Sequence, residues 1–382
     1  MSEMVPLPQR VLMTTDTVGG VWSYSVDLAR GLAARGVEVA LATMGGPLSE
    51  AQRETTERIP GLRVFESTFR VEWMEDPWRD VERAGDWLLA LETRIAPDLV
   101  HLNGYAHAAL PWIAPKLVVA HSCMLSWWSA VKGEPAPEAW DRYRREAGAG
   151  LAAADLVVAP TASVLADLAH HHGLPRRSRV IGHGRDGRLF RPAAKEPIVF
   201  AAGGPGDEAK NLGALERIAP EVPWTIYVAG ETAPPDAASR GARAHFTRHL
   251  GRLSPRALAA WLGRSAIYAL PARYEPFGLA VLEAALAGCA LVLGDIPSLR
   301  ETWRNRAAFV PPDDPPALAA ALTRLIEDPD RRASLAAGAR KRAVELTPER
   351  MLAGYLAAYG ELLGERALPL AAGLLASAPM AV

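Results

Sequence analysis

The sequence contains few cysteines and no long hydrophobic run, and its formal net charge is only −1. The two cysteines, Cys123 and Cys289, lie far apart in apolar surroundings, which favours buried, reduced thiols in a cytoplasmic protein over a disulfide framework. No apolar run is long enough to span a membrane, and residues 1–9 lack the apolar core of a signal peptide. The balanced charge gives no reason to expect a nucleic-acid partner.

The composition that remains is that of a globular protein. The chain has 382 residues, of which 49% are hydrophobic and 22% are charged, and this is enough material for about two domains. Nearly all basic residues are arginines, so Lys210 is conspicuous in its region. The segment 367–375 is apolar, short and interrupted by Pro369. We expect it to form a docked or frayed tail, with at most a peripheral membrane contact.

The first half of the chain alternates strand-like runs with helical segments. A strand at 10–14 is followed by the pair Gly19-Gly20, a helix over 21–35 and a strand at 37–43. This order opens a parallel α/β sheet. Further short apolar runs follow at 99–102, 117–121, 156–159 and 180–181.

A second series of strand-like runs begins after a loop-like stretch from Asp186 to Pro197. Helices are expected from Pro315 through Leu325 and from Pro348 to Gly360. Parallel sheets bind ligands at the carboxyl ends of their strands, so the pattern predicts two similar α/β domains with a cleft between them. The strand-like runs of this series are 197–202, 224–229, 267–270, 290–293 and 308–310.

Two glutamates eight residues apart, Glu275 and Glu283, mark the most informative segment. Pro276 forbids helix at Glu275 and suits a helix start. The first carboxylate is therefore expected on a loop after a strand, and the second inside the next helix. The free N–H groups at the start of that helix favour anions or sugar oxygens; they belong to Phe277, Gly278 and Leu279. The alternative is that Glu275 only stabilises its own helix and Glu283 is solvated.

In this order and spacing, the motifs of the chain resemble those of retaining nucleotide-sugar glycosyltransferases of family 4. The motifs are Gly19-Gly20-Val21, Asp98-Leu99-Val100-His101, Val119-Ala120-His121-Ser122, Glu208-Ala209-Lys210-Asn211, Tyr227-Val228-Ala229-Gly230-Glu231 and the Glu275–Glu283 segment. The resemblance implies the α/β fold called GT-B, with two Rossmann-like domains facing each other across a cleft. It places an acceptor-side domain at 1–190, a donor domain at 191–350, and a C-terminal helix and tail at 351–382 that cross back to the first domain.

The resemblance also implies a role for each matching residue. Lys210 would contact the donor diphosphate, Glu283 the ribose hydroxyls, and Glu275 the donor sugar. His121 would lie across the cleft near the reaction centre, so Glu275 and His121 are the predicted catalytic residues. Besides Lys210 and Glu283, the predicted donor-binding residues are Phe277, Gly278, Leu279, Asn211, Gly203, Glu231 and Gly20. The predicted acceptor-side residues are Gly19, Asp16, His101, Trp127 and Trp128.

The implied reaction transfers a hexose from a UDP- or GDP-type donor with retention of configuration. Lys210 and helix N-termini would stabilise the departing diphosphate, so no metal or other cofactor is expected. The acceptor is a small molecule, a glycan or a lipid-linked compound. A carboxylate near the sugar can offset oxocarbenium charge.

Several alternatives stay open from the residues alone. His121 and His101 can be structural, and Trp127 and Trp128 can be core residues or part of a lid. The run of three histidines at 170–172 is expected on a solvated surface, because adjacent helical side chains point in different directions. The chain has Gly204 where the family commonly has an arginine. The alternative function is therefore a degenerate, non-catalytic partner protein; a different reaction on the same fold is a third option.

Overall fold

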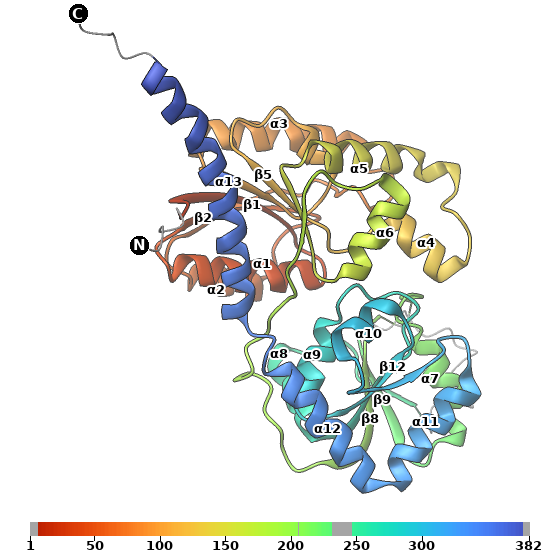
Figure 1. The fold of residues 1–382 in the computed structure, drawn as a ribbon. Helices are drawn as coiled ribbons and strands as arrows, with labels where there is room; N and C mark the ends of the chain where they lie inside the picture. Colours follow the sequence, from red (N-terminus) through yellow and green to blue (C-terminus); the bar gives the residue numbers. More distant parts are fainter. Residues whose placement is uncertain (1–6, 205, 231–246, 377–382) are drawn as a thin grey trace, which may run out of the picture.

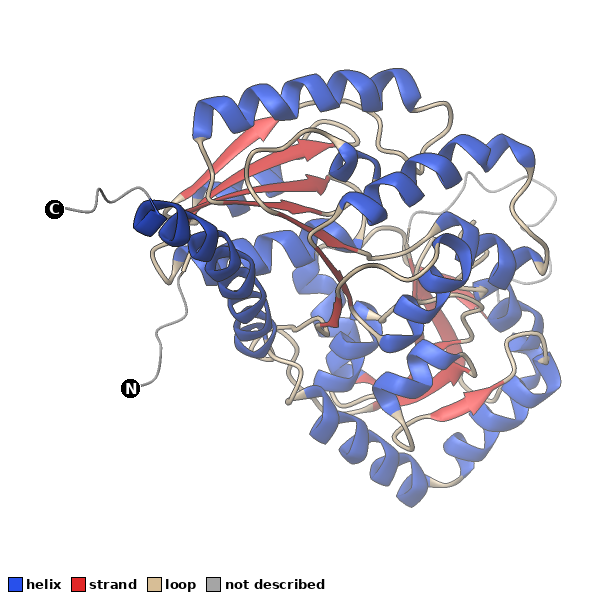
Figure 2. Cartoon of the chain, turned by 45° about the horizontal axis from the view of Figure 1, so that its top comes forward, coloured by secondary structure: helices blue, strands red, loops and turns tan. Residues whose placement is uncertain are grey.

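The computed structural model describes residues 7–204, 206–230 and 247–376, and only the backbone of 365–376. Two parallel β-sheets form from separate halves of the chain, each flanked by helices (Figures 1 and 2). The first sheet consists of β1 (Arg10–Asp16), β2 (Glu38–Met44), β3 (Leu62–Glu66), β4 (Leu99–Leu102), β5 (Lys116–Val119), β6 (Leu156–Ala159) and β7 (Ser178–Val180). The second consists of β8 (Glu196–Ala202), β9 (Thr225–Ala229), β10 (Thr247–His249), β11 (Ser265–Leu270), β12 (Ala290–Gly294) and β13 (Ala308–Val310).

Helices cover both sheets. Those of the first half are α1 (Gly20–Ala33), α2 (Glu50–Glu57), α3 (Trp78–Ile95), α4 (Met124–Lys132), α5 (Asp141–Ala153) and α6 (Ala162–His172). Those of the second half are α7 (Leu212–Ile218), α8 (Pro255–Arg264), α9 (Leu279–Leu286), α10 (Pro297–Trp303), α11 (Pro315–Glu327), α12 (Pro329–Ala343) and α13 (Pro348–Ala376). Short 3-10 turns are η1 (Ala106–Ala109), η2 (Glu138–Trp140) and η3 (Ala219–Glu221).

The first sheet has the strand order β3-β2-β1-β4-β5-β6-β7. Its strands are apolar on both sides because helices cover both faces. On β1, Val11 and Met13 pack in one core with α1 and α13, whereas Leu12 packs in another with α3. This alternation follows from the two-residue period of a strand. Because all of these strands pair in parallel, their carboxyl ends lie along one edge of the sheet.

The second sheet has the order β10-β9-β8-β11-β12-β13 and a single apolar core. Its central strand β11 is buried along its whole length. Trp303 and Tyr268 are among its fully buried side chains. The carboxyl ends of β8 and β11 carry the loops that contain Lys210 and Glu275.

The C-terminal helix α13 leaves the second half and packs against the first (Figure 1). Its residues Leu352, Tyr355 and Tyr359 join the core that contains α1. Within the described residues, no helix combines the length and the apolar character needed to cross a membrane.

The predicted fold class is confirmed, because two parallel α/β sheets form as the sequence pattern indicated. The predicted end of the last helix at Gly360 is wrong, since α13 continues to Ala376. Pro369 costs this helix one backbone hydrogen bond, but the alanines and leucines around it are strong helix formers. The first strand also continues two residues further than predicted, to Asp16.

Candidate active site

The carboxyl ends of the two sheets face each other across the boundary between the halves. Tyr274, which follows β11, accepts a hydrogen bond at its hydroxyl from the Cys123 N–H after β5 (3.0 Å). The Thr161 hydroxyl at the start of α6 donates to the Pro276 carbonyl (3.2 Å). A Cβ atom on Gly20 would lie 3.6 Å from the Leu279 side chain. These contacts join the two halves, and one of them brings together two predicted site residues, Gly20 and Leu279.

Glu275 lies on the loop before α9 and uses both carboxylate oxygens. Oε1 accepts the Gly278 N–H at 2.9 Å and the Phe277 N–H at 3.4 Å, while Oε2 forms an ion pair with Lys210. The Ser298 hydroxyl donates to the Glu275 carbonyl (2.6 Å) and fixes the loop. Glu275 thus caps its own helix, as the alternative interpretation held, and it also pairs with a cation. The other part of that alternative, a solvated Glu283, is wrong, because Glu283 is buried.

Gly278 is the residue that lets the chain turn into α9. Its φ of 88° is in the left-handed region, which glycine adopts without a steric penalty. A Cβ atom there would lie 3.0 Å from the Val281 side chain. The turn leaves the N–H groups of Phe277 and Gly278 beside the Glu275 carboxylate.

Lys210 lies on the loop after β8 and forms an ion pair with Glu275 on the loop after β11. Burial disfavours its charge, but the Glu275 carboxylate outweighs this effect and raises the pKa of Lys210. A Cβ atom on Gly203 would lie 3.3 Å from the Lys210 side chain, so the two residues adjoin. The Lys210 ammonium is therefore a fixed cation at the start of α9.

The other donor-side predictions have different surroundings. Asn211 is buried in the left-handed conformation, and its amide donates to the carbonyls of Pro271 (3.0 Å) and Pro312 (2.7 Å). This anchors the Lys210 loop. Glu231 lies outside the described residues.

Glu283 is buried in α9 and paired with a residue of the connecting segment. The Arg185 guanidinium donates to Glu283 (2.7 Å) and to Asp27 on α1 (2.7 Å). Burial raises the pKa of Glu283, and Arg185 opposes that rise. Arg185 thus joins the two halves of the molecule. It is committed to these carboxylates and not to the loop with Gly204.

His121 follows β5 and belongs to a hydrogen-bond network of the first sheet. The Asn103 amide donates to the Thr14 carbonyl (2.7 Å), so its oxygen Oδ1 faces the His121 Nε2 at 2.7 Å. An amide oxygen only accepts, and Nε2 therefore carries the proton while Nδ1 is an acceptor. Burial lowers the pKa of His121 well below its usual value, and His183 and His101 add to this. The imidazole is neutral at physiological pH.

His101, predicted on the acceptor side, is fully buried beneath this network. Its Nδ1 lies 2.7 Å from the Tyr359 hydroxyl of α13, and its Nε2 lies 3.3 Å from both Asn103 Oδ1 and the Tyr24 hydroxyl. Burial lowers its pKa to about 3. The structure thus separates His101 from the cleft and makes it a support for Asn103.

The remaining acceptor-side predictions lie at the carboxyl-end edge of the first sheet. Gly19 precedes α1 with a φ of 81°. Trp127 and Trp128 on α4 contact each other edge to face, and the Lys132 ammonium lies over both rings. Lys132 also forms an ion pair with Glu208 of the opposite half (2.7 Å). Asp16 ends β1, and its Oδ1 accepts the Val18 N–H at 3.1 Å.

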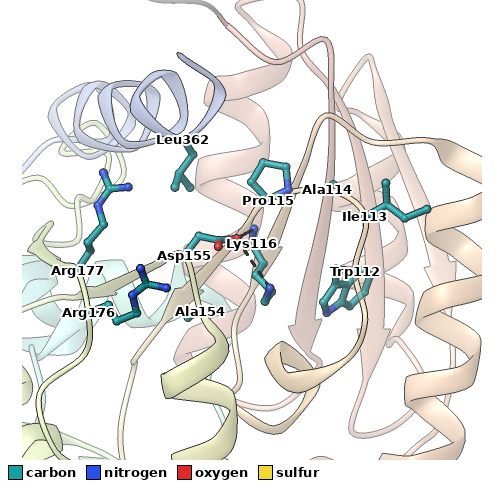
Figure 3. A pocket seen from close by; sticks show the side chains of 10 residues that line it. All are labelled: Trp112, Ile113, Ala114, Pro115, Lys116, Ala154, Asp155, Arg176, Arg177 and Leu362. Atoms are coloured by element: carbon teal, nitrogen blue, oxygen red, sulfur yellow. Dashed lines mark hydrogen bonds and ion pairs between the residues drawn. The ribbon is translucent and has the colours of Figure 1, made fainter. Parts of the chain in front are cut away.

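A separate hollow of about 430 Å³ lies at the other edge of the first sheet, where β5 and β6 begin (Figure 3). Lys116 and Asp155 line it as an ion pair (3.9 Å), with Leu362 of α13 beside them. Parallel sheets bind ligands at the opposite ends of their strands. None of the predicted site residues lines this hollow.

The three histidines that end α6 do not form a metal cluster. His172 faces inward, with its Nε2 3.6 Å from the Cys123 thiol. Within the described residues, no group of three or more His, Cys, Asp or Glu side chains is arranged to hold a metal ion.

Three residues of the site were missed from the sequence. Asn103 orients His121, His183 stacks on the His121 ring (centroids 5.4 Å apart), and Arg185 holds Glu283. Only Asn103 carried a usable signal, since it is a polar residue directly after the strand that ends in His101-Leu102. The partners of Arg185 and His183 lie too far along the chain for local patterns to reveal.

Comparisons with known proteins cover both halves. A family model described as Glycosyltransferase Family 4 matches residues 18–187, and one described as Glycosyl transferases group 1 matches 220–342. The chain is 26% identical over 380 residues to a D-inositol 3-phosphate glycosyltransferase of Thermobispora bispora, covering 86% of each chain. It is 38% identical over 138 residues to a glycogen synthase of Mycobacterium tuberculosis, which is 34% of this chain and 33% of that one.

Solved structures share the fold. A sucrose-phosphate synthase from Thermosynechococcus elongatus has a TM-score of 0.79 at 21% identity, over 94% of this chain and 100% of that one. HepE of Anabaena, in complex with UDP and glucose, has a TM-score of 0.72 at 16% identity, over 92% and 100% of the two chains.

Proposed function

Because this chain belongs to glycosyltransferase family 4, we propose that it transfers a hexose from a nucleotide-sugar donor to a hydroxyl acceptor, with retention of configuration and without a metal ion. One observation carries this proposal. The Lys210–Glu275 ion pair lies at the N-terminus of α9, on the edge of the second sheet that faces His121.

The geometry supports a donor held along the second sheet. Lys210 and the positive N-terminal end of α9 are the groups that a diphosphate requires. Glu275 lies beside them and can accept hydroxyls of the donor sugar. Glu283 lies in the second turn of α9. Arg185 holds its Oε1, and its other oxygen can accept the ribose hydroxyls. The two carboxylates therefore hold two ends of one donor and are not an acid–base pair.

In the proposed reaction, the bond between the anomeric carbon and the diphosphate oxygen breaks, and the electron pair leaves with the nucleotide. The acceptor oxygen bonds the anomeric carbon on the same face, and its proton passes to the departing phosphate oxygen. Lys210 offsets the charge that develops on the leaving group. Neutral His121, whose Nδ1 is an acceptor, can bind a sugar hydroxyl without adding positive charge near the oxocarbenium centre.

The test is nucleotide release in EDTA from a panel of UDP-, GDP-, ADP- and dTDP-sugars. One donor of the panel should bind and turn over. Glu275→Ala should lower turnover roughly 100-fold or more while the protein stays folded by circular dichroism. Glu221→Ala removes an exposed carboxylate of the same half and should change nothing. Absence of binding across the panel would contradict the proposal.

The alternative of a non-catalytic partner protein rests on Gly204. The retained Lys210, Glu275 and Glu283 argue against it. The variant Gly204→Arg separates the enzyme from the non-catalytic partner. A partner protein that has lost its phosphate clamp would gain nucleotide affinity but no turnover, whereas an enzyme turns over the donor.

A further inference from the structure

We propose that the protein binds a small phosphorylated metabolite, a phosphate monoester, in a hollow between the two halves that is distinct from the donor site. The hollow has a volume of about 410 Å³, within the range of roughly 300–1,000 Å³ that is typical of small-molecule sites. None of Lys210, Glu275 and His121 lines it. We call it the arginine hollow, after the four arginines in its lining: Arg179, Arg304, Arg342 and Arg350.

These four arginines converge from separate elements of both halves. Arg179 lies on β7 of the first sheet, Arg304 ends α10, Arg342 lies on α12, and Arg350 lies on α13. The φ of Arg304 is 51°, in the left-handed region that residues with a Cβ atom rarely adopt. Like charges that share one hollow repel each other, and an anion placed among them is attracted to all of them.

Two of the four arginines are available to a ligand. Within the described part of the chain, the side chains of Arg304 and Arg350 have neither a hydrogen bond nor an ion pair. The other two are already paired, Arg179 with a glutamate of α13 and Arg342 with the glutamate three residues after it. A phosphate group in the hollow would therefore meet two free guanidinium groups, and each can donate two parallel hydrogen bonds to phosphate oxygens.

The negative charge of the arginine hollow is fully used by the backbone. Glu301 is the one carboxylate among its described lining residues. One Glu301 oxygen accepts the Ala162 N–H (2.8 Å) and the other accepts the Ser163 N–H (3.0 Å). These bonds hold α10 of the second half against the start of α6 in the first. The charge that remains free in the hollow is thus positive.

The apolar part of the lining favours an organic phosphate over inorganic phosphate. Val180, Ile181, Leu346 and Met351 line the hollow together with the arginines, and the Val180 side chain is 43% exposed. The carbon skeleton of an ester can cover such side chains and remove apolar surface from water. Inorganic phosphate lacks that skeleton and gains only the contacts with the guanidinium groups.

His183 and Phe277 form a wall that the arginine hollow shares with the reaction centre. Both line the hollow, and their rings contact each other with centroids 4.9 Å apart. The His183 ring also stacks on His121, and the Phe277 N–H donates to Glu275. A ligand that contacts both halves restricts their relative motion, so a donor that binds between them loses less freedom. Occupancy of the hollow should therefore strengthen donor binding.

Isothermal titration calorimetry of the full chain, without any donor, tests the binding step. The probes are glucose 6-phosphate and glycerol 3-phosphate, their neutral parents glucose and glycerol, and inorganic phosphate. At least one ester should bind about tenfold or more tightly than its neutral parent and than inorganic phosphate. Failure of both esters to do so would overturn the inference.

A matched pair of double variants locates the binding. Arg304→Met with Arg350→Met should weaken ester binding about tenfold or more. Arg256→Met with Arg331→Met removes two exposed arginines of the same half, outside the hollow, and should bind the ester like wild type. Circular dichroism checks that both proteins are folded. An ester affinity that survives in Arg304→Met with Arg350→Met would place the ligand elsewhere, such as the acceptor site, and would contradict the inference.

The donor that the nucleotide-sugar panel identifies tests the coupling, and only this part depends on the proposed function. A saturating ester should raise donor affinity about fivefold or more in wild type and should have no effect in Arg304→Met with Arg350→Met. An unchanged donor affinity in wild type would contradict the coupling. Failure of every donor to bind would instead count against the proposed function, while the calorimetric result would still decide whether the arginine hollow binds an ester.

Discussion

Asp16 links stability and pH at the scale of a single residue. Burial raises the pKa of its carboxyl from 3.8 to about 7, while the Val18 N–H and the Trp73 side chain oppose the rise. In the unfolded chain this group ionises near pH 4, so between pH 4 and 7 its ionisation favours unfolding. The stability that the protonated form contributes is therefore lost as the pH rises toward 7, and stays lost above it.

Asp16→Asn should remove this pH dependence. We expect the variant to be more stable than wild type at pH 8, by at most about 4 kcal/mol, with the difference falling toward zero near pH 4. Denaturant unfolding at pH 4.5 and pH 8 measures it, with Glu75→Gln, which removes an exposed carboxylate, as the control. The buried titratable groups Glu72 and His107 lie near Asp16, but both are present in each protein and cancel in the difference. An equal shift at both pH values would contradict the explanation.

At the same scale, the sequence identified Glu275, Lys210 and His121 as neighbours, and the structure brings them to the facing edges of the two sheets. It could not supply their partners. Asn103 follows the strand next to that of His121, and His183 lies in the segment that connects the two halves. Only the folded chain places them beside His121, and neither belongs to a motif with a fixed spacing. The structural partners of Asn211 were not predictable either, and it was assigned to donor binding because it follows Lys210. Its amide instead anchors the loop to Pro271 and Pro312.

At the scale of elements, the start of α9 is a turn that depends on Gly278. Gly278→Ala must place a Cβ atom in the left-handed region, 3.0 Å from Val281. We expect a loss of about 1–2 kcal/mol in the free energy of unfolding, together with weaker donor binding, because the N–H groups beside Glu275 shift.

Gly364→Ala is the control, since Gly364 lies in α13 with open space around it. This variant should be more stable than wild type by about 0.5–1 kcal/mol. Thermal unfolding and nucleotide titration measure both variants. A Gly278→Ala protein as stable as wild type would contradict the steric explanation.

Elements with a strong period were predictable, and those without one were not. The strands at 10–16, 265–270 and 290–294 are buried along nearly their whole length, and the sequence pattern indicated the apolar part of each, at 10–14, 267–270 and 290–293. By contrast, β3 alternates partly buried and exposed residues and β10 has only three residues, so neither stands out from a loop.

At the scale of the whole molecule, Arg185 joins the two halves through Asp27 on α1 and Glu283 on α9. Arg185→Met should lower stability by about 3–5 kcal/mol, because it leaves the buried Glu283 without its cation. The double variant Arg185→Met with Glu283→Leu should recover most of this loss, since the buried Glu283 charge is then absent and Asp27 keeps its ion pair with Arg30.

Arg188→Met is the matched control. Arg188 also pairs with a carboxylate, Asp186, but its side chain is 82% exposed, and exposed pairs contribute at most about 1 kcal/mol. Calorimetric unfolding compares the three variants. Equal losses for Arg185→Met and Arg188→Met would show that the bridge between the halves is not stabilising.

We expect the protein to transfer a hexose with retention of configuration and without a metal ion, at the boundary between His121 and the Lys210–Glu275 pair. Proton NMR of the first glycoside formed in EDTA, from an α-configured nucleotide sugar and an acceptor that the protein uses, determines the configuration of the product. We expect an α-linked product, formed at a rate that EDTA does not diminish. A β-linked product, or a reaction that stops in EDTA and returns with Mg²⁺, would contradict it.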